Sequence, residues 1–226
     1  MLVNSILLSI LIQILTGGID VWGLTIKLPA NYKIYNELLQ IELGVQVIEL
    51  IFYIWLIVKL KSLGNITIYR YMDWFITTPT MLLTLMIYLY HNDKEPLTVK
   101  EFITRYPRDI GLVFLLNALM LVFGLLSEYK VLSVPVAVTL GFIPFAYYFW
   151  FIYKKYLGSL QRPKTNIYLY FLVFWSLYGV MAYLPYEQKN IGYNILDLFA
   201  KNGFGILLVY LIWQKSKSAN SSNQVY

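Results

Sequence analysis

One lysine, Lys201, stands in the middle of the last long apolar run of the chain, residues 191–213. It lies about ten residues from either end, so the amine cannot easily reach water, and a charge at that depth is costly. Asp197 precedes it by four residues, on the same face of a helix. Buried lysines form imines with carbonyl compounds, and a protonated imine needs an anion beside it. The pattern indicates a reactive amine with a carboxylate partner. A buried ion pair that only joins helices is the alternative.

The apolar run at residues 68–90 places one carboxyl and three hydroxyl groups on a single helix face. These groups belong to Asp73, Thr77, Thr80 and Thr84. Arg70 lies one turn before the carboxyl and can neutralise it. Threonine hydroxyls often bond back to their own helix, so the hydroxyls alone do not define a site. Pro79 predicts a kink.

A polar stripe also crosses the run at residues 36–60, where Glu42, Gln46 and Glu49 recur at helical spacing. Two intramembrane glutamates usually line a water-filled path, and carboxylates in such a path favour cations. Other polar residues of the first and last runs extend this lining: Ser9, Gln13, Asn194 and Asn202. The alternative is that Glu42 is solvated at the end of its helix and Glu49 is protonated and hydrogen-bonded within the bundle.

The composition decides which elements carry these residues. The chain has 226 residues, of which 59% are apolar and 13% charged, roughly half the usual charged fraction of a soluble domain. The apolar runs are continuous and do not alternate, which favours membrane helices over a β-barrel. Seven runs are long enough: 3–24, 36–60, 68–90, 110–128, 131–154, 167–186 and 191–213. We therefore expect an all-α membrane protein, a seven-transmembrane-helix bundle over residues 1–214, with a short polar cytoplasmic tail over residues 215–226.

The positive charges predict the orientation. Of the 18 Lys and Arg residues, Arg70 and Lys201 lie within runs. Four lie in the loops on one side and twelve in the loops and end on the other. The positive-inside rule then places the N-terminus outside the cell. The net charge of +6 therefore indicates topology and no nucleic-acid partner. The chain has no cysteine, which excludes thiolate chemistry, and the single histidine, His91, is expected to be solvated in a loop without a metal.

Three stretches match a known family. The residues RYMDW at 70–74, followed by TTP at 77–79, resemble the third helix of microbial (type 1) rhodopsins. The residues WSLY at 175–178 are similar to the sixth helix of that family, and LDLFAKNGFG at 196–205 resembles the seventh. The motifs occur in the family's order and on the expected helices, so the resemblance covers nearly the whole chain.

The resemblance implies a cofactor and a role for each of these residues. Lys201 would carry all-trans retinal as a protonated Schiff base, with Asp73 as principal counter-ion and proton acceptor. Asp197 would be the second counter-ion, and Arg70 would steady both acids from the extracellular side. The retinal pocket would include Trp74, Thr78, Trp175 and Tyr178, and Thr77 would hydrogen-bond near the acceptor.

The chain departs from the pattern of the family's outward proton pumps at several positions. Thr84 stands where those pumps commonly have an acid that returns a proton to the Schiff base, and threonine cannot supply one. Gly179 replaces a frequent proline. The loop expected at residues 186–190 has no pair of proton-releasing glutamates, only Glu187. Each departure weakens the case for a fast pump.

The compact chain, its opening ILIQILTGGID at residues 10–20 and the glutamates of the second run resemble the group 1 viral rhodopsins of large algal viruses. That resemblance implies a virus-encoded, light-gated cation channel in a membrane, which passes monovalent cations or protons and can form a homo-oligomer. An outward proton pump is the alternative, and a sensory rhodopsin is a weaker one. No phosphate loop or nucleophile–base pair indicates an enzyme.

Overall fold

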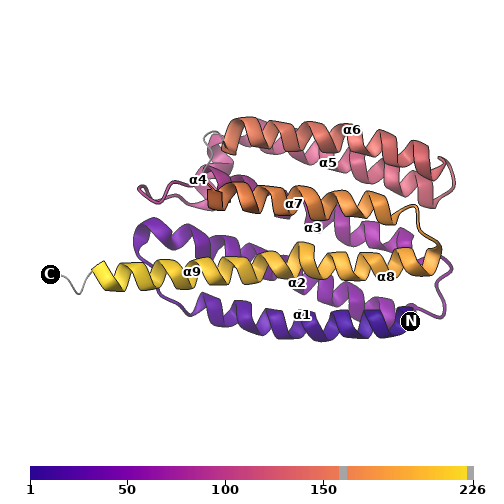
Figure 1. Cartoon of the computed structure of the whole chain (residues 1–226), viewed down its shortest axis with the longest axis horizontal. Coiled ribbons are helices and arrows are strands. Elements are labelled where there is room, and N and C mark those ends of the chain that lie inside the picture. Colours follow the sequence, from indigo (N-terminus) through magenta and orange to yellow (C-terminus); the bar gives the residue numbers. More distant parts are fainter. Residues whose placement is uncertain (158–161, 223–226) are drawn as a thin grey trace.

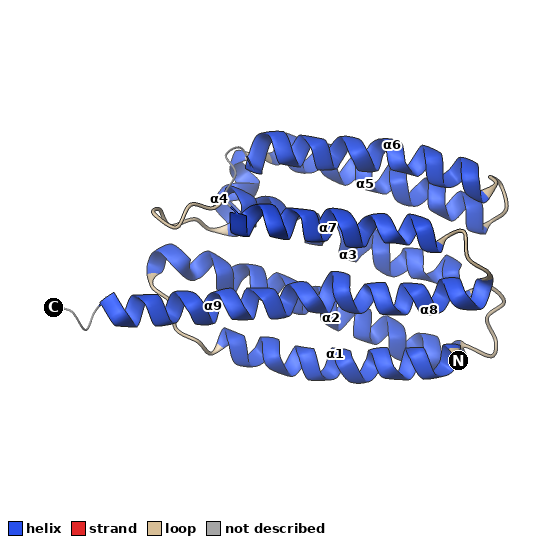
Figure 2. Ribbon diagram, in the orientation of Figure 1, coloured by secondary structure: helices blue, strands red, loops and turns tan. Residues whose placement is uncertain are grey.

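The computed structural model describes residues 1–157 and 162–222, and this part of the chain is helical without a strand (Figures 1 and 2). Seven long helical segments lie side by side. The first six are α1 (Leu2–Leu24), α2 (Lys33–Lys59), α3 (Ile66–Tyr90), α5 (Pro107–Glu128), α6 (Val134–Ile152) and α7 (Arg162–Met181). The seventh is one continuous rod made of α8 (Tyr186–Asp197), η3 (Leu198–Asn202) and α9 (Gly203–Ser222). The shorter elements are η1 (Ala30–Tyr32), α4 (Val99–Arg105) and η2 (Tyr153–Leu157).

The seven predicted spans are confirmed as helical segments, with shifted ends. Six of the segments are long and apolar enough to cross a membrane. The remaining one, α7, begins with two basic residues, Arg162 and Lys164, and packs against α8, α3 and α6. The α4 helix is an element that the sequence analysis did not anticipate. It begins with a capping box between Thr98 and Glu101.

The connection between the last two segments differs from the expectation. The sixth predicted span ends at residue 186, whereas α7 ends at Met181 and a tight turn follows. Pro185 lacks an amide hydrogen and caps the start of α8, so the helix cannot run through it. Residues 186–190, predicted to be a loop, therefore form the first turns of α8. At the other end, α9 continues to Ser222, so most of the predicted tail is helical.

The α1 helix is polar inside and apolar outside. Its buried face carries Ser9, Gln13, Thr16 and Asp20 at helical spacing. Its exposed face carries large apolar side chains, among them Leu7, Leu8, Leu11, Ile14 and Leu15. This is the inverse of a surface helix in a soluble protein, and it fits a helix with lipid on one side. The buried groups must find partners on α2 and on the α8–α9 rod.

A polar cluster ties the ends of four segments together at the end of the bundle where α1 finishes. The Asp93 carboxylate, just after α3, accepts a hydrogen bond from Tyr35 on α2 (2.9 Å) and one from Lys215 on α9 (2.5 Å). On α7, the Lys164 ammonium donates to the backbone oxygen of His91 at 2.5 Å. The prediction that His91 is solvated is wrong. Its ring is buried edge-on against Tyr35, 3.5 Å from the Asp93 carboxylate.

This cluster generates a prediction about stability and pH. The His91 ring, Lys215 and Tyr35 hold the pKa of Asp93 well below its usual 3.8. A carboxylate with a lowered pKa in the folded state stabilises the protein above its unfolded pKa, and this stabilisation is lost as the pH falls through the folded value. We expect Asp93→Asn to lower the free energy of unfolding at pH 7 by about 1 kcal/mol or less, because the carboxylate is partly exposed.

The measurement is the thermal midpoint of both proteins between pH 7 and pH 2. The difference between them should shrink as the pH falls below about 4. Glu95→Gln, an exposed neighbour in the same loop, is the control and should leave the midpoint unchanged. A difference that does not depend on pH would contradict an ionic role for Asp93.

Candidate functional site

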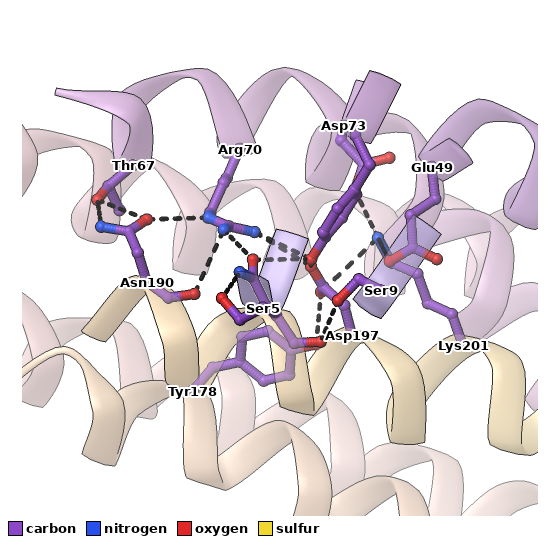
Figure 3. Close-up of polar contacts among 12 residues, drawn as sticks. Ser5, Ser9, Glu49, Thr67, Arg70, Asp73, Tyr178, Asn190, Asp197 and Lys201 are labelled. Carbon is purple, nitrogen blue, oxygen red and sulfur yellow. Dashed lines mark hydrogen bonds and ion pairs between the residues drawn. The ribbon is translucent and has the colours of Figure 1, made fainter. Parts of the chain in front are cut away.

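The Lys201 amine lies among three carboxylates in the centre of the bundle (Figure 3). Its Nζ is 2.5 Å from Asp73 Oδ2 on α3, 3.4 Å from Glu49 Oε1 on α2 and 3.8 Å from Asp197 Oδ1 on α8. All four side chains are 4% exposed or less. Ion pairs so deep are strongly coupled, because little water screens them. The structure thus brings the two predicted acids to the lysine and adds Glu49 as a third.

Asp197 is held from several sides. Its carboxylate accepts hydrogen bonds from Tyr53 (2.7 Å) and Tyr178 (2.8 Å), and Arg70 Nη1 lies 3.3 Å away. These partners come from α2, α7 and α3. The negative charge of Asp197 is therefore compensated whatever happens at Lys201.

Asp73 is held differently. Its Oδ2 is bonded to Lys201, and no hydrogen-bond partner of its Oδ1 lies within the described residues. The Thr77 hydroxyl, expected near this acid, donates to the Asp73 backbone oxygen at 3.0 Å and not to the carboxylate. The charge of Asp73 thus depends mainly on the lysine. Compared with Asp197, it can more readily exchange the ion pair for a proton, because fewer other groups stabilise its charge.

Arg70 is fixed largely by neutral groups. Its guanidinium donates to the side-chain oxygen of Asn190 (3.1 Å), to that of Asn194 and to the Tyr53 hydroxyl (3.2 Å). The sequence analysis missed Tyr53 and Asn190. Helical spacing contained the signal, because Tyr53 follows Glu49 by four residues and Asn190 precedes Asn194 by four.

Buried polar side chains continue from this site along α1, α2 and the α8–α9 rod. The seven residues predicted to line an ion path are all 2% exposed or less: Ser9, Gln13, Glu42, Gln46, Glu49, Asn194 and Asn202. Glu42 is fully buried and accepts a hydrogen bond from the Thr84 hydroxyl. The alternative that Glu42 is solvated is therefore wrong. We call these seven residues, together with Thr16 and Asp20, the polar line.

Several atoms of the polar line have no hydrogen-bond partner among the described residues. They are both amide atoms of Gln13, Asp20 Oδ1, Glu42 Oε2, both carboxylate oxygens of Glu49 and Asn202 Oδ1. An unpaired buried polar atom costs about 1–3 kcal/mol, so such atoms normally bind water or an ion. The line has the chemistry of a hydrated path, and most of its unpaired atoms are oxygens.

A separate apolar cavity of about 130 Å³ opens beside Lys201 on the side of α5 and α6. Its wall includes the four residues predicted for a chromophore pocket, Trp74, Thr78, Trp175 and Tyr178, together with Met120, Gly141 and Phe145. The Thr78 hydroxyl accepts a hydrogen bond from Asn117 on α5 at 2.8 Å, a partner that the sequence analysis did not identify. The cavity is a slot of rings and aliphatic groups with one amine in its wall.

The backbone changes its winding at the lysine. Residues Leu198–Asn202 form η3, a π-helical turn within the last rod. Single π turns inside α-helices occur frequently at functional sites. Here the turn presents Lys201 to Asp73, whereas the next residue, Asn202, reaches Thr16 on α1 at 2.7 Å. One short segment therefore touches both the cavity and the polar line.

The chain is similar to proteins of known structure. The family described as bacteriorhodopsin-like protein matches residues 1–215. The crystal structure of viral rhodopsin OLPVRII is 26% identical, with a TM-score of 0.80, and the match covers 94% of this chain and 98% of that one. Thermophilic rhodopsin from Rubrobacter xylanophilus is 18% identical over 96% and 98% of the two chains, with a TM-score of 0.75. Xanthorhodopsin, a light-driven ion pump with dual chromophore, is 18% identical over 97% and 94%, with a TM-score of 0.74. Among curated protein sequences, none matches.

The site generates a prediction for the protein without any ligand. Lys201→Met removes the cation that faces three buried carboxylates, and breaking a buried pair from one side costs about 3–5 kcal/mol. We expect a large fall in the thermal midpoint. Lys155→Met is the matched control, because its ion pair with Asp109 is partly exposed and should contribute about 1 kcal/mol or less. Equal losses in the two variants would contradict the central role of the buried amine.

Proposed function

The chain belongs to the bacteriorhodopsin-like family, the microbial rhodopsins, and on this premise we propose that it is a retinal-binding photoreceptor that acts as a light-gated cation channel. The observation that carries the channel proposal is the polar line, whose unpaired, fully buried oxygens run along α1, α2 and η3. The family fold and its apolar helices make it an integral, multi-pass membrane protein. A virus as its source, an extracellular N-terminus and assembly into a homo-oligomer remain predictions.

The residues present fit retinal. A long polyene needs an apolar cavity with aromatic walls, and its aldehyde needs an amine in the wall of that cavity. The cavity supplies both, since Lys201 lies in its wall beside Trp74, Trp175 and Tyr178. When bound at the Lys201 nitrogen, all-trans retinal would supply light absorption and a light-driven change of shape.

The acids around the nitrogen have different tasks. Asp197 keeps its charge through Tyr53, Tyr178 and Arg70, so it provides a constant negative charge beside the nitrogen. Asp73 has the shortest contact with Lys201 and few other partners, so a proton leaving the nitrogen passes most directly to its Oδ2. This transfer neutralises both members of the pair, which removes the cost of keeping two charges buried.

Glu49 links the site to the polar line. Its Oε1 lies 3.4 Å from the Lys201 nitrogen, and Gln46 and Glu42 follow on the same face of α2. A change of charge at the nitrogen therefore acts directly on a carboxylate of the proposed path. Carboxylates along the path favour cations over anions.

A specific contact keeps an outward proton pump as the second candidate. Thr84 stands where pumps of the family commonly have the acid that returns a proton, and here its hydroxyl donates to Glu42. Glu42 lies two turns from Glu49, in the direction away from Tyr53 and Arg70. A buried carboxyl is thus present on that side of the lysine, supplied by α2 in place of α3, and it can serve as the donor.

The chromophore assignment makes a direct prediction. Lys201→Ala should abolish the visible absorption band of the protein reconstituted with all-trans retinal, because no other buried amine lies in the cavity wall. Lys155→Ala, whose ion pair with Asp109 lies outside the cavity, should keep the band. A band retained by Lys201→Ala would overturn the assignment of Lys201.

The channel proposal is tested by the photocurrent of a voltage-clamped cell supplied with retinal. We expect a current that reverses sign with voltage, at a potential that follows external sodium or potassium. Glu49→Gln should change the current per pigment or the reversal potential, because it removes a charge from the path. The control is Glu101→Gln on α4, an exposed cap position where glutamine is tolerated. A current that stays outward at every voltage would establish the pump instead.

A further inference from the structure

Asp20 is a fully buried carboxylate of the polar line to which no individual role has been assigned. It lies on the inner face of α1, four residues after Thr16. Its Oδ2 accepts a hydrogen bond from the Gln46 side-chain amide on α2. Its Oδ1 has no hydrogen-bond partner in the described part of the chain. A buried carboxylate with one oxygen unpaired is costly unless it gains a proton or a cation.

Asp20 is one end of a chain of hydrogen bonds between three segments, and the backbone of α1 connects the two ends of that chain. Gln46 donates to Asp20 and accepts from the Asn202 amide at 3.3 Å. Asn202 in turn donates to Thr16 at 2.7 Å, which returns the chain to α1. The unpaired atom of Asn202 is also an oxygen, Oδ1. We call these four side chains the inner ring: Thr16, Asp20, Gln46 and Asn202.

A glycine on α9 leaves space for the side chains of this ring. Gly205 on α9 faces Asp20 and Gln46 so closely that a Cβ added there would collide with Asp20 Oδ2 and with Gln46 Nε2. Any side chain at this position would displace the pair. A glycine that permits a close approach of polar side chains indicates that their position matters.

The inner ring is attached to the reactive lysine. Asn202 is the residue after Lys201, and both lie in the π turn η3. A displacement of the lysine backbone therefore moves the amide that bridges Gln46 and Thr16. Loss of those two hydrogen bonds would leave Gln46 Oε1 without its donor, in addition to the unpaired Asp20 Oδ1 and Asn202 Oδ1, while Gln46 Nε2 still donates to Asp20 Oδ2.

We infer that the inner ring is a gate that is closed in the dark. When the hydrogen bonds from Asn202 to Thr16 and Gln46 break, Asp20 becomes the residue that binds the passing cation. The ligand is a monovalent cation such as sodium or potassium, because the ring offers one carboxylate and two amide oxygens and such ions bind oxygen ligands. The inference rests on the channel proposed above and deepens it, by naming a residue on α1 that sets cation passage.

The first test is Asp20→Asn, which keeps the size of the side chain and removes the charge. Absorbance of the pigment should be unchanged and should count the folded protein. We expect the sodium current per pigment to fall roughly fivefold or more, the scale of one lost charge contact, and the reversal potential to follow external sodium less closely. A current and a reversal potential equal to those of the wild type would show that Asp20 is a neutral, structural hydrogen-bond acceptor and overturn the inference.

The second test addresses the gate through Gly205→Ala. The added methyl group should separate Asp20 from Gln46, so the current should decay more slowly after the light is switched off, by roughly threefold or more, or persist in the dark. Gly18→Ala and Gly44→Ala are matched controls, because an added Cβ meets nothing within 4 Å at either position. Unchanged closing in a Gly205→Ala protein that keeps its pigment would exclude the ring as a gate.

Different results would contradict the channel proposal and the cation-binding role of Asp20. A wild-type current that never reverses with voltage removes the channel, and with it the cation role of Asp20. A wild-type current that reverses, together with an unaltered Asp20→Asn current, removes Asp20 alone and leaves the channel in place.

Discussion

The fold is organised around a cluster of buried charges that nearly cancel. Two cations, Lys201 and Arg70, face three acids, Asp73, Asp197 and Glu49, and all five side chains are 4% exposed or less. In a medium that solvates ions poorly, such a cluster is tolerable only if its members stay paired and close to neutral. With one carboxyl protonated the cluster is neutral, and moving a proton within it leaves the total charge unchanged.

This constraint explains which helices are central. The charges come from α2, α3 and the α8–η3 segment, so these segments must keep their distance and rotation relative to one another. The Tyr53 and Tyr178 hydroxyls and the Asn190 and Asn194 amides act as fixed supports around Asp197 and Arg70. Asp73 lacks comparable support. Asp197 and Arg70 are therefore held rigidly, whereas Asp73 can change its protonation state. This asymmetry lets a photoreceptor move a proton toward one acid and not the other.

The polar line also affects how α1 is held in the bundle, because most of the inner face of this helix is polar. A helix whose inner face is made of hydroxyl, amide and carboxyl groups gains little from apolar packing against its neighbours. It is held by directional contacts, such as those of Thr16 with Asn202, and by lipid on its outer face. Hydrogen bonds of this kind can be exchanged for contacts with water or ions at a small net cost. An interface of this composition opens more readily than a packed apolar one.

The sequence predicted the elements and the central lysine because both depend on local information. Run length gives a membrane helix, and a charge deep in a run marks a site. Periodicity alone did not predict the contacts between helices, since it defines a face of a helix but not the helix that the face meets. Asp20 had no predicted role. It continues the stripe of Ser9, Gln13 and Thr16, but only the position of α2 shows that Gln46 reaches it.

Thr84 and His91 show the same limit. In the sequence, Thr84 stands where an acid is expected on α3, whereas in the structure its hydroxyl donates to Glu42, so a carboxyl group from α2 lies at this position. His91 looks like a loop residue because Asn92 and Asp93 follow it. It is buried because Tyr35 and Lys164, distant in the sequence, close over it. In both cases, contacts between helical segments determine the environment of the residue, and the sequence does not show these contacts.

The π turn at Lys201 joins the two halves of the molecule. In a regular α-helix, neighbouring residues diverge by a fixed angle, and the whole rod keeps one face toward each neighbour. A π turn inserts extra backbone locally and loosens the ladder of hydrogen bonds. Lys201 can therefore contact Asp73 on α3 while Asn202, next in the chain, contacts α1 and α2. The reactive nitrogen and the polar line then share one peptide segment. A displacement of Lys201 therefore moves Asn202 of the polar line directly through the backbone, with no intervening side chain. The π turn that contains both residues is the least tightly wound part of its helix.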